Sequence, residues 1–187
     1  MTFIADLWLP ILVSAVLVFA VSAVIHMGPF WHRSEFPALA EQDRIQDALR
    51  PFGIAPGEYM LPRPRDMKDC NQPEFVEKLT RGPVAILTVV PNGRMSMGKP
   101  LMQWGVYTLI VSALAAYVTH ATVAPDATYL HVFRVAGTVA FVAYAVGLWQ
   151  NSIWFHRPWS NTLKHTLDGL IYGCLTGGAF GWLWSTA

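Results

Sequence analysis

Four histidines and one aspartate lie at the ends of apolar stretches, where membrane-crossing helices would bring their side chains to a common depth. His26 and His32 follow the first apolar stretch, His156 and His165 lie in the polar link before the last one, and Asp168 comes one helical turn after His165. Neutral imidazole and carboxylate groups are ligands for zinc, iron or copper. We therefore treat His26, His156, His165 and Asp168 as candidate metal ligands.

No motif such as HxxxH or ExxH joins these residues, so a metal site would form only if distant helices converged. Imidazoles at the level of the lipid headgroups also anchor helix ends or make structural hydrogen bonds. Only His165 and Asp168 share one helix face. We therefore favour anchoring over a metal site.

A second pair of histidines has the placement of haem ligands. His120 ends the second apolar stretch and His131 opens the third, so their imidazoles are expected at similar depths. Two such imidazoles supply both axial ligands of a haem. Both residues lie near the surface, however, and electron transfer across a membrane generally needs a second centre. Haem is thus an alternative to a protein without a cofactor, which we favour.

Arg134 is the charge that is most costly to place in a membrane, about one and a half turns into the third apolar stretch. A charge at the centre of a spanning helix costs at least ~2.5–3.5 kcal/mol on insertion scales, and less near an end. The side chain can extend outward to the interface or pair with Asp126. Arg134 is a candidate functional charge within the membrane.

Motifs typical of common enzymes are absent from the sequence. It contains no GxSxG, no phosphate-binding loop, no GxGxxG after a strand, no HExxH and no CxxC. The formal net charge is +1 and no basic run occurs, which argues against a nucleic-acid partner. The sequence therefore predicts a non-enzymatic protein.

The elements that must position these residues follow from an uneven distribution of charge. The chain of 187 residues is 53% hydrophobic, and ten of its thirteen Lys and Arg residues fall between Arg33 and Lys99. About 20 apolar residues suffice to cross a bilayer as a helix, and four stretches qualify, at about 3–25, 101–121, 129–149 and 166–184. We predict an all-α membrane protein, a four-span transmembrane helix bundle with a small cytoplasmic α/β insert between spans 1 and 2.

The predicted organisation has three parts: transmembrane helix 1 at 1–28, the insert at 29–99, and transmembrane helices 2–4 at 100–187. Lys and Arg concentrate in the insert and recur in the link 150–165, so the positive-inside rule places both in the cytoplasm and both termini outside. A cleavable signal peptide is the competing interpretation of the first stretch, but no basic residue precedes that stretch. We expect a protein of the bacterial inner membrane.

The insert is expected to hold two short helices and two short strands. An amphipathic stripe that includes Ile45 and Leu49 predicts a helix ending at Arg50, before Pro51. Capping and strand signals predict a helix over 72–80, a strand over 84–90 and a partner strand over 58–61. So small a unit has little core of its own, and we expect it to rest on the membrane, on the bundle or on another subunit.

The last apolar stretch carries glycines at strict four-residue spacing, at Gly169, Gly173, Gly177 and Gly181. On a helix these positions share one face, which lets another backbone approach closely. The third stretch offers a counterpart of small residues at Ala136, Ala140, Ala143 and Gly147. Either this counterpart or another polypeptide fills the glycine face, and we favour packing within the chain.

The small size, the close-packing helix face and the lack of catalytic motifs together suggest an assembly role. We expect a non-enzymatic accessory or assembly subunit of a larger membrane complex, whose partners are the lipid bilayer and other membrane subunits or a second copy. A haem- or metal-binding redox membrane protein is the alternative. A small transporter or channel formed by an oligomer is a third interpretation, but the apolar stretches offer few polar groups to line a path.

Overall fold

The computed structural model describes residues 2–28 and 32–184. The chain divides into two compact units, one made of Met1–Pro37 with Ser96–Ala187 and the other of Ala38–Met95. The first unit is a helical bundle, and the second contains a small two-stranded sheet.

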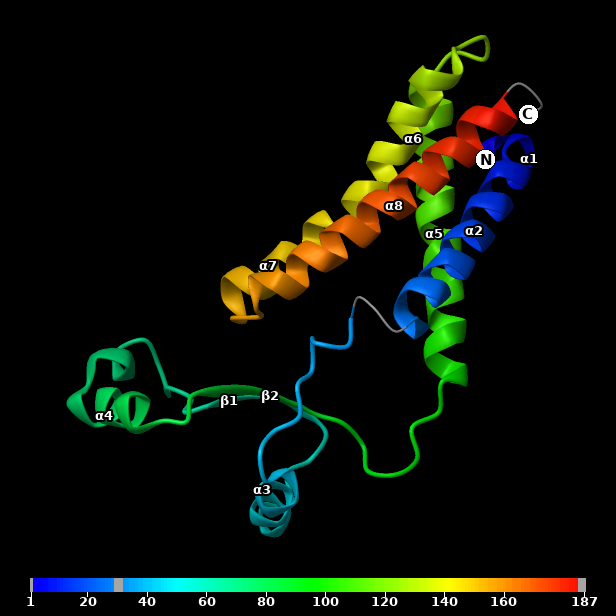
Figure 1. Cartoon of the computed structure of the whole chain (residues 1–187). Coiled ribbons are helices and arrows are strands. Elements are labelled where there is room, and N and C mark those ends of the chain that lie inside the picture. Colours follow the sequence, from blue (N-terminus) through cyan, green and yellow to red (C-terminus); the bar gives the residue numbers. More distant parts are fainter. Residues whose placement is uncertain (1, 29–31, 185–187) are drawn as a thin grey trace. The chain divides into compact units, whose positions relative to one another are not determined.

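Long and short helices make up the first unit (Figure 1). They are α1 (Thr2–Asp6), α2 (Trp8–Met27), α5 (Gly98–Thr122), α6 (Tyr129–Tyr144), α7 (Trp149–Trp154) and α8 (Trp159–Leu183). Among the described residues, three helical stretches are long and apolar enough to cross a membrane. They are α2, α5 and the 26-residue stretch Tyr129–Trp154, which comprises α6, a short 3-10 turn and α7. The fold is therefore mostly helical with three candidate spans, which supports a membrane location.

The fourth predicted span corresponds to α8, which is not among the candidate spans of the described residues. The helix has 25 residues, so its length is sufficient. Asp168 and the row of glycines lower its mean hydropathy. The helix also begins at Trp159, earlier than the predicted start at 166, because it follows directly on the extended backbone of Pro158 and continues through polar residues.

The third predicted span is not one continuous α-helix. Ala145 leaves helical geometry with φ −121° and ψ −51°, and a 3-10 turn, Val146–Leu148, separates α6 from α7. At this point the backbones of α6 and α8 come close, since a Cβ added to Gly169 would lie 2.6 Å from the Cβ of Ala145. A 3-10 stretch within a helix often marks a functional hinge or a sequence under strain.

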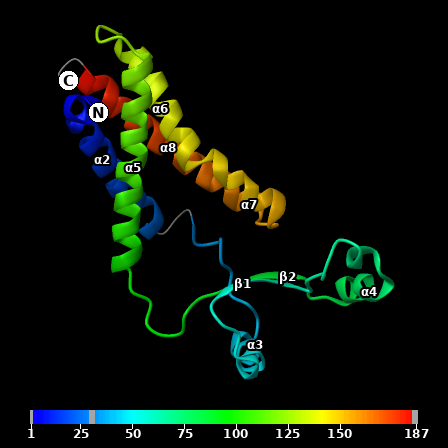
Figure 2. The ribbon, with the colours of Figure 1, turned by 180° about the vertical axis from the view of Figure 1, so that it is seen from behind.

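The helices α6 and α8 lie side by side, and α2 and α5 complete the bundle (Figures 1 and 2). Buried apolar side chains such as Val18, Val111 and Tyr172 fill the space between the helices. Hydroxyl groups add direct links between α2 and α5, where Ser14 Oγ donates a hydrogen bond of 3.0 Å to Ser112 Oγ. The helices that carry the candidate site are thus fixed to one another by packing along their length.

The glycines of α8 lie against α6. An added Cβ at Gly177 would lie 2.6 Å from the carbonyl oxygen of Phe133, and one at Gly173 would lie 2.9 Å from that of Gly137. Real Cβ atoms do not tolerate such contacts, so at these positions only glycine allows the two backbones to approach as they do.

The face of α6 that meets these glycines differs from the predicted row of small residues. It is formed by Tyr129, Phe133, Gly137, Phe141 and Ala145. Ala136 and Ala140 are fully buried among core side chains that include residues of α2 and α5, Ala143 packs at the edge of that core, and a Cβ at Gly147 would meet open space. The small residues of α6 therefore serve its approach to the rest of the bundle.

The second unit contains α3 (Gln42–Leu49), a 3-10 turn (Arg50–Phe52), β1 (Gly57–Leu61), a 3-10 turn (Asp69–Asn71), α4 (Pro73–Arg81) and β2 (Ala85–Val89). The strands pair antiparallel, with Gly57 opposite Val89 and Leu61 opposite Ala85, which confirms the predicted two-stranded sheet. No residue between 38 and 95, all of which the structure describes, is buried. The unit therefore has no closed core.

Candidate metal centre

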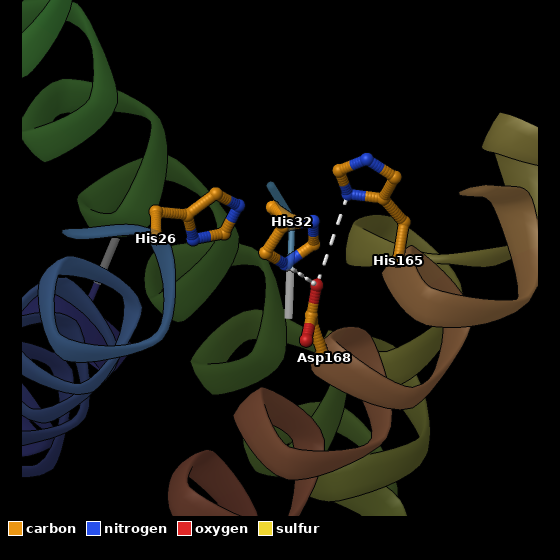
Figure 3. A group of neighbouring side chains, drawn as sticks. All are labelled: His26, His32, His165 and Asp168. Atoms are coloured by element: carbon orange, nitrogen blue, oxygen red, sulfur yellow. Dashed lines mark ion pairs between the residues drawn. The ribbon is translucent and has the colours of Figure 1, made fainter. Parts of the chain in front are cut away.

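Three histidines and one aspartate from separate parts of the chain meet at one end of the bundle (Figure 3). His26 lies in the last turn of α2, and His32 follows it in the connecting chain. His165 and Asp168 lie one turn apart near the start of α8. Each residue offers one ligand atom, and these four atoms all lie within 4.8 Å of one another.

The carboxylate of Asp168 is the centre of the group. Its Oδ2 atom lies 3.0 Å from Nε2 of His32 and 3.8 Å from Nδ1 of His165 (Figure 3). The imidazole rings of His26 and His32 stack in parallel, with centroids 4.4 Å apart. The Asp168 side chain is only 3% exposed, so its charge needs compensation from these neighbours.

Glu35 contacts two of the imidazoles on the side of each ring that faces away from Asp168. Its Oε1 atom lies 2.5 Å from Nδ1 of His32, and its Oε2 atom lies 3.1 Å from Nε2 of His165. When these two nitrogens donate to Glu35, the opposite nitrogen of each ring faces Asp168. These are Nε2 of His32 and Nδ1 of His165. One carboxylate thus sets the orientation of both rings.

His26 has the same arrangement with a different acceptor. Its Nδ1 atom lies 2.9 Å from the carbonyl oxygen of Ser22, one turn earlier on α2. A proton on Nδ1 therefore leaves the lone pair of Nε2 available to a ligand. In metalloproteins, the second ring nitrogen of a ligating histidine is held in this way by a carboxylate or a carbonyl group.

Two buried atoms of the group lack a directed hydrogen bond. Nε2 of His32 and Oδ2 of Asp168 are close enough to form an ion pair, yet within 2–28 and 32–184 neither has a partner in hydrogen-bonding geometry. Buried polar atoms are almost always satisfied. The two atoms are 3.0 Å apart, so a third species could contact both of them only from the side.

Arg157 introduces a competing protonation state. Its Nη2 atom lies 2.8 Å from Nε2 of His165 and 3.1 Å from Oε2 of Glu35. If Arg157 donates to Nε2 of His165, the proton of that ring lies on Nδ1 and no lone pair faces Asp168. If Nε2 carries the proton and donates to Glu35, Nδ1 is free to bind a metal. A cation held beside Asp168 would favour the second state, because only that state offers a lone pair on Nδ1.

The charge of Glu35 follows from its surroundings. Burial raises its pKa, but hydrogen bonds and charges from His32 and His165 outweigh burial and hold the pKa below its ordinary value. Glu35 is therefore a carboxylate at neutral pH and accepts hydrogen bonds through both oxygens. Its contribution to folding is present above the ordinary pKa and is lost as the pH falls through the lowered one.

The short segment that carries His32 and Glu35 is fastened to the start of α8. Lys164 Nζ donates a hydrogen bond of 2.8 Å to Ser34 Oγ, and Asn161 Nδ2 lies 3.5 Å from the carbonyl oxygen of Glu35. These contacts bring a connecting segment to the buried Asp168. They explain how a chain without a local ligand motif assembles the group.

The group differs in one member from the set predicted by sequence. The structure brings together His26, His165 and Asp168, adds His32, and leaves His156 exposed in left-handed backbone conformation with φ 54°. Glu35 was not predicted. Its position three residues after His32 is the signal that could have revealed it, since a turn brings such residues together.

The other predicted residues lie elsewhere. His120 lies 3.5 Å from Asp6 of α1 through Nε2, and His131 is exposed on α6. Within the described ranges, no hydrogen bond or ring contact joins these two histidines. Arg134 is exposed and lines a shallow cavity of about 190 Å³ between α6 and α8.

A larger cavity adjoins the metal-ligand group. It has a volume of about 370 Å³ and is lined by His26, His165 and Asp168 together with side chains of α5, α6 and α8. The break after α6 contributes Gly147 and Leu148 to its wall. A species held by the group would therefore be accessible from this cavity.

Comparisons of the chain with protein-family models, with curated proteins and with solved structures find no match.

Proposed function

We propose that this protein is a membrane protein that binds one divalent transition-metal ion through His26, His32, His165 and Asp168. One observation carries the proposal. Each of the three imidazoles has one nitrogen at hydrogen-bond distance from a fixed acceptor and offers its other nitrogen to the same small volume as Oδ2 of Asp168. This is the outer-shell arrangement of histidine metal sites.

The spacing of the ligand atoms supports the proposal. With bonds of ~2.0–2.1 Å, ligands of a tetrahedral ion lie about 3.3 Å apart. The separations of 3.0 and 3.8 Å from Oδ2 of Asp168 fall on either side of that value. The four ligand atoms lie within 4.8 Å of one another, so rotations of the side chains would be needed to close the site around an ion.

The donor set limits the choice of ion. Three neutral imidazoles and one carboxylate suit zinc and iron(II), whereas calcium and magnesium prefer oxygen ligands throughout. With four protein ligands, zinc would have a closed tetrahedral shell. An ion that takes five or six ligands would keep positions open toward the cavity. We therefore expect zinc or iron(II).

We propose four spans, with α8 as the fourth. Its glycines contact α6 from Tyr129 to Ala145, so α8 runs through the same depth as the candidate span Tyr129–Trp154. The distribution of Lys and Arg favours a cytoplasmic location for the second unit and for the metal end of the bundle. Both termini would then lie outside, in a protein of the bacterial inner membrane.

The first test is metal content and affinity. The full chain, purified in detergent without chelators, is expected to contain about one ion per chain by mass spectrometry. After stripping, titration with Co²⁺ should give the visible bands of a histidine-bound ion. His32→Ala and Asp168→Asn should each weaken binding by at least about 100-fold.

The matched control for these variants is His131→Ala, which removes an exposed histidine outside the group and should bind cobalt as the wild type does. Weak binding that is equal in wild type, Asp168→Asn and His131→Ala would refute the metal site. A Soret band in the same sample would favour haem instead.

A role as an accessory or assembly subunit is the second candidate. It is favoured by the lack of any buried residue between 38 and 95, where apolar side chains such as Tyr59, Met60 and Leu61 are exposed. A partner subunit would cover them. Chains that co-purify from the native membrane in fixed stoichiometry would support this role, and a monodisperse single chain would contradict it.

A further inference from the structure

We propose that the cavity beside the metal-ligand group binds a small organic anion with an apolar body, of which a carboxylate is the simplest kind. The inference rests on the proposed metal site and adds the class of its ligand. The cavity, of about 370 Å³, is within the size range of small-molecule sites. Its walls combine aromatic rings with tyrosine hydroxyls that have no acceptor among the described residues.

Two tyrosine hydroxyls carry the argument. Tyr144 is 6% exposed and Tyr172 is 3% exposed, and both line the cavity. Neither hydroxyl has a hydrogen-bond partner among the residues that the structure describes. Tyr107 lines the same cavity but donates a hydrogen bond of 2.8 Å to the carbonyl oxygen of Ala143. Buried hydroxyls of tyrosine ordinarily find a partner. Those of Tyr144 and Tyr172 therefore call for an acceptor inside the cavity.

The rings define the rest of the ligand. Trp104, Tyr107, Tyr144 and Tyr172 contact one another with centroids 5.3 to 6.3 Å apart. Such a wall accommodates an apolar or aromatic body. The ligand should therefore have an apolar end and an end that accepts hydrogen bonds.

The charged groups that line the cavity determine whether an anion can bind there. Arg157 lines the cavity and is partly exposed, so its guanidinium offers further N–H donors. Asp168 also lines the cavity and by itself would repel an anion. A divalent cation on Asp168 reverses the local charge. Anion binding should consequently require the metal.

The test uses benzoate as the probe, with the full chain in detergent and isothermal titration calorimetry as the readout. Benzoate should bind the metal-loaded protein and show at least tenfold weaker binding to the stripped protein. Tyr144→Phe and Tyr172→Phe should each weaken binding by about three- to tenfold, because each removes one neutral hydrogen bond. Both variants should bind Co²⁺ as the wild type does.

The matched control is Tyr117→Phe, whose ring lies against Phe3 at the other end of α5, and it should leave benzoate binding unchanged. Absence of benzoate binding to the metal-loaded protein would overturn the inference, since the cavity would then hold only water. Equal binding by wild type and both tyrosine variants would overturn it as well. The cobalt titration of the same samples reports on the metal site independently, so the two failures are distinguishable.

Discussion

Glu35 connects the two imidazoles that belong to different parts of the chain. Its two oxygens lie 2.5 Å from Nδ1 of His32 and 3.1 Å from Nε2 of His165. Because Glu35 contacts one nitrogen of each ring, a single carboxylate turns Nε2 of His32 and Nδ1 of His165 toward Asp168. Glu35 is thus a positioning residue, because it would act on a bound metal only through the two imidazoles.

Replacement of Glu35 by glutamine tests this role. In Glu35→Gln the amide NH₂ cannot accept a hydrogen bond, so only one imidazole keeps its acceptor. Loss of an outer-shell partner typically lowers metal affinity by about 10- to 100-fold, and we expect a decrease of that size in cobalt titrations. Glu41→Gln, which alters an exposed carboxylate of the second unit, is the control. An unchanged affinity in Glu35→Gln would show that the rings are oriented by packing alone.

Depth along the predicted helices placed His26, His165 and Asp168 at one membrane interface, but it did not indicate that the helices converge there. The choice between His32 and His156 was not within reach of the sequence. It depends on hydrogen bonds that fasten the segment around Ser34 to Lys164 on α8, and such contacts between distant segments leave no periodic pattern.

At the level of elements, the contact between α6 and α8 is the closest in the bundle. Backbone approaches backbone at Gly173 and Gly177, and the start of α8 that carries His165 and Asp168 belongs to the same rigid helix. Packing along this contact therefore positions two of the four ligands. It also leaves the glycine face occupied within the chain, so a partner would have to bind elsewhere.

A pair of adjacent glycines tests the contact. Gly177→Ala places a Cβ 2.6 Å from the carbonyl oxygen of Phe133, and overpacking of this kind costs about 1–3 kcal/mol. The melting temperature in detergent should fall. Gly178→Ala is the matched control, because its Cβ meets only the Tyr129 hydroxyl at 3.8 Å. That variant should melt at the same temperature or higher, since alanine favours helix by up to ~1 kcal/mol. Equal melting temperatures would contradict the close contact.

Hydropathy and turn signals predicted most helices and strands, because the formation of these elements depends on local sequence. The pairing of 58–61 with 84–90 and the helix before Pro51 are of this kind. The break after Tyr144 was not predicted, since the stretch 129–149 is uniformly apolar. It reflects the approach of α8 to Ala145, a contact between helices.

For the whole molecule, the proposed topology has a direct test in the two natural cysteines. Cys70 lies in the second unit and is partly exposed, and Cys174 is exposed on α8, where lipid would surround it. A membrane-impermeant maleimide should label Cys70 in inside-out vesicles but not in intact spheroplasts. A cysteine appended after Ala187 in a Cys70→Ser background should react in spheroplasts. If it reacts only in inside-out vesicles, α8 does not cross the membrane.

The candidate ligands come from two segments that are far apart in the sequence, and this has a consequence for synthesis. His26 and His32 emerge early from the ribosome, whereas His165 and Asp168 are made only after α5, α6 and α7. An unfinished chain holds two imidazoles and no carboxylate of the group. If the group holds an ion, capture of that ion would have to wait for α8, so metallation would distinguish chains that contain α8 from chains that stop before it.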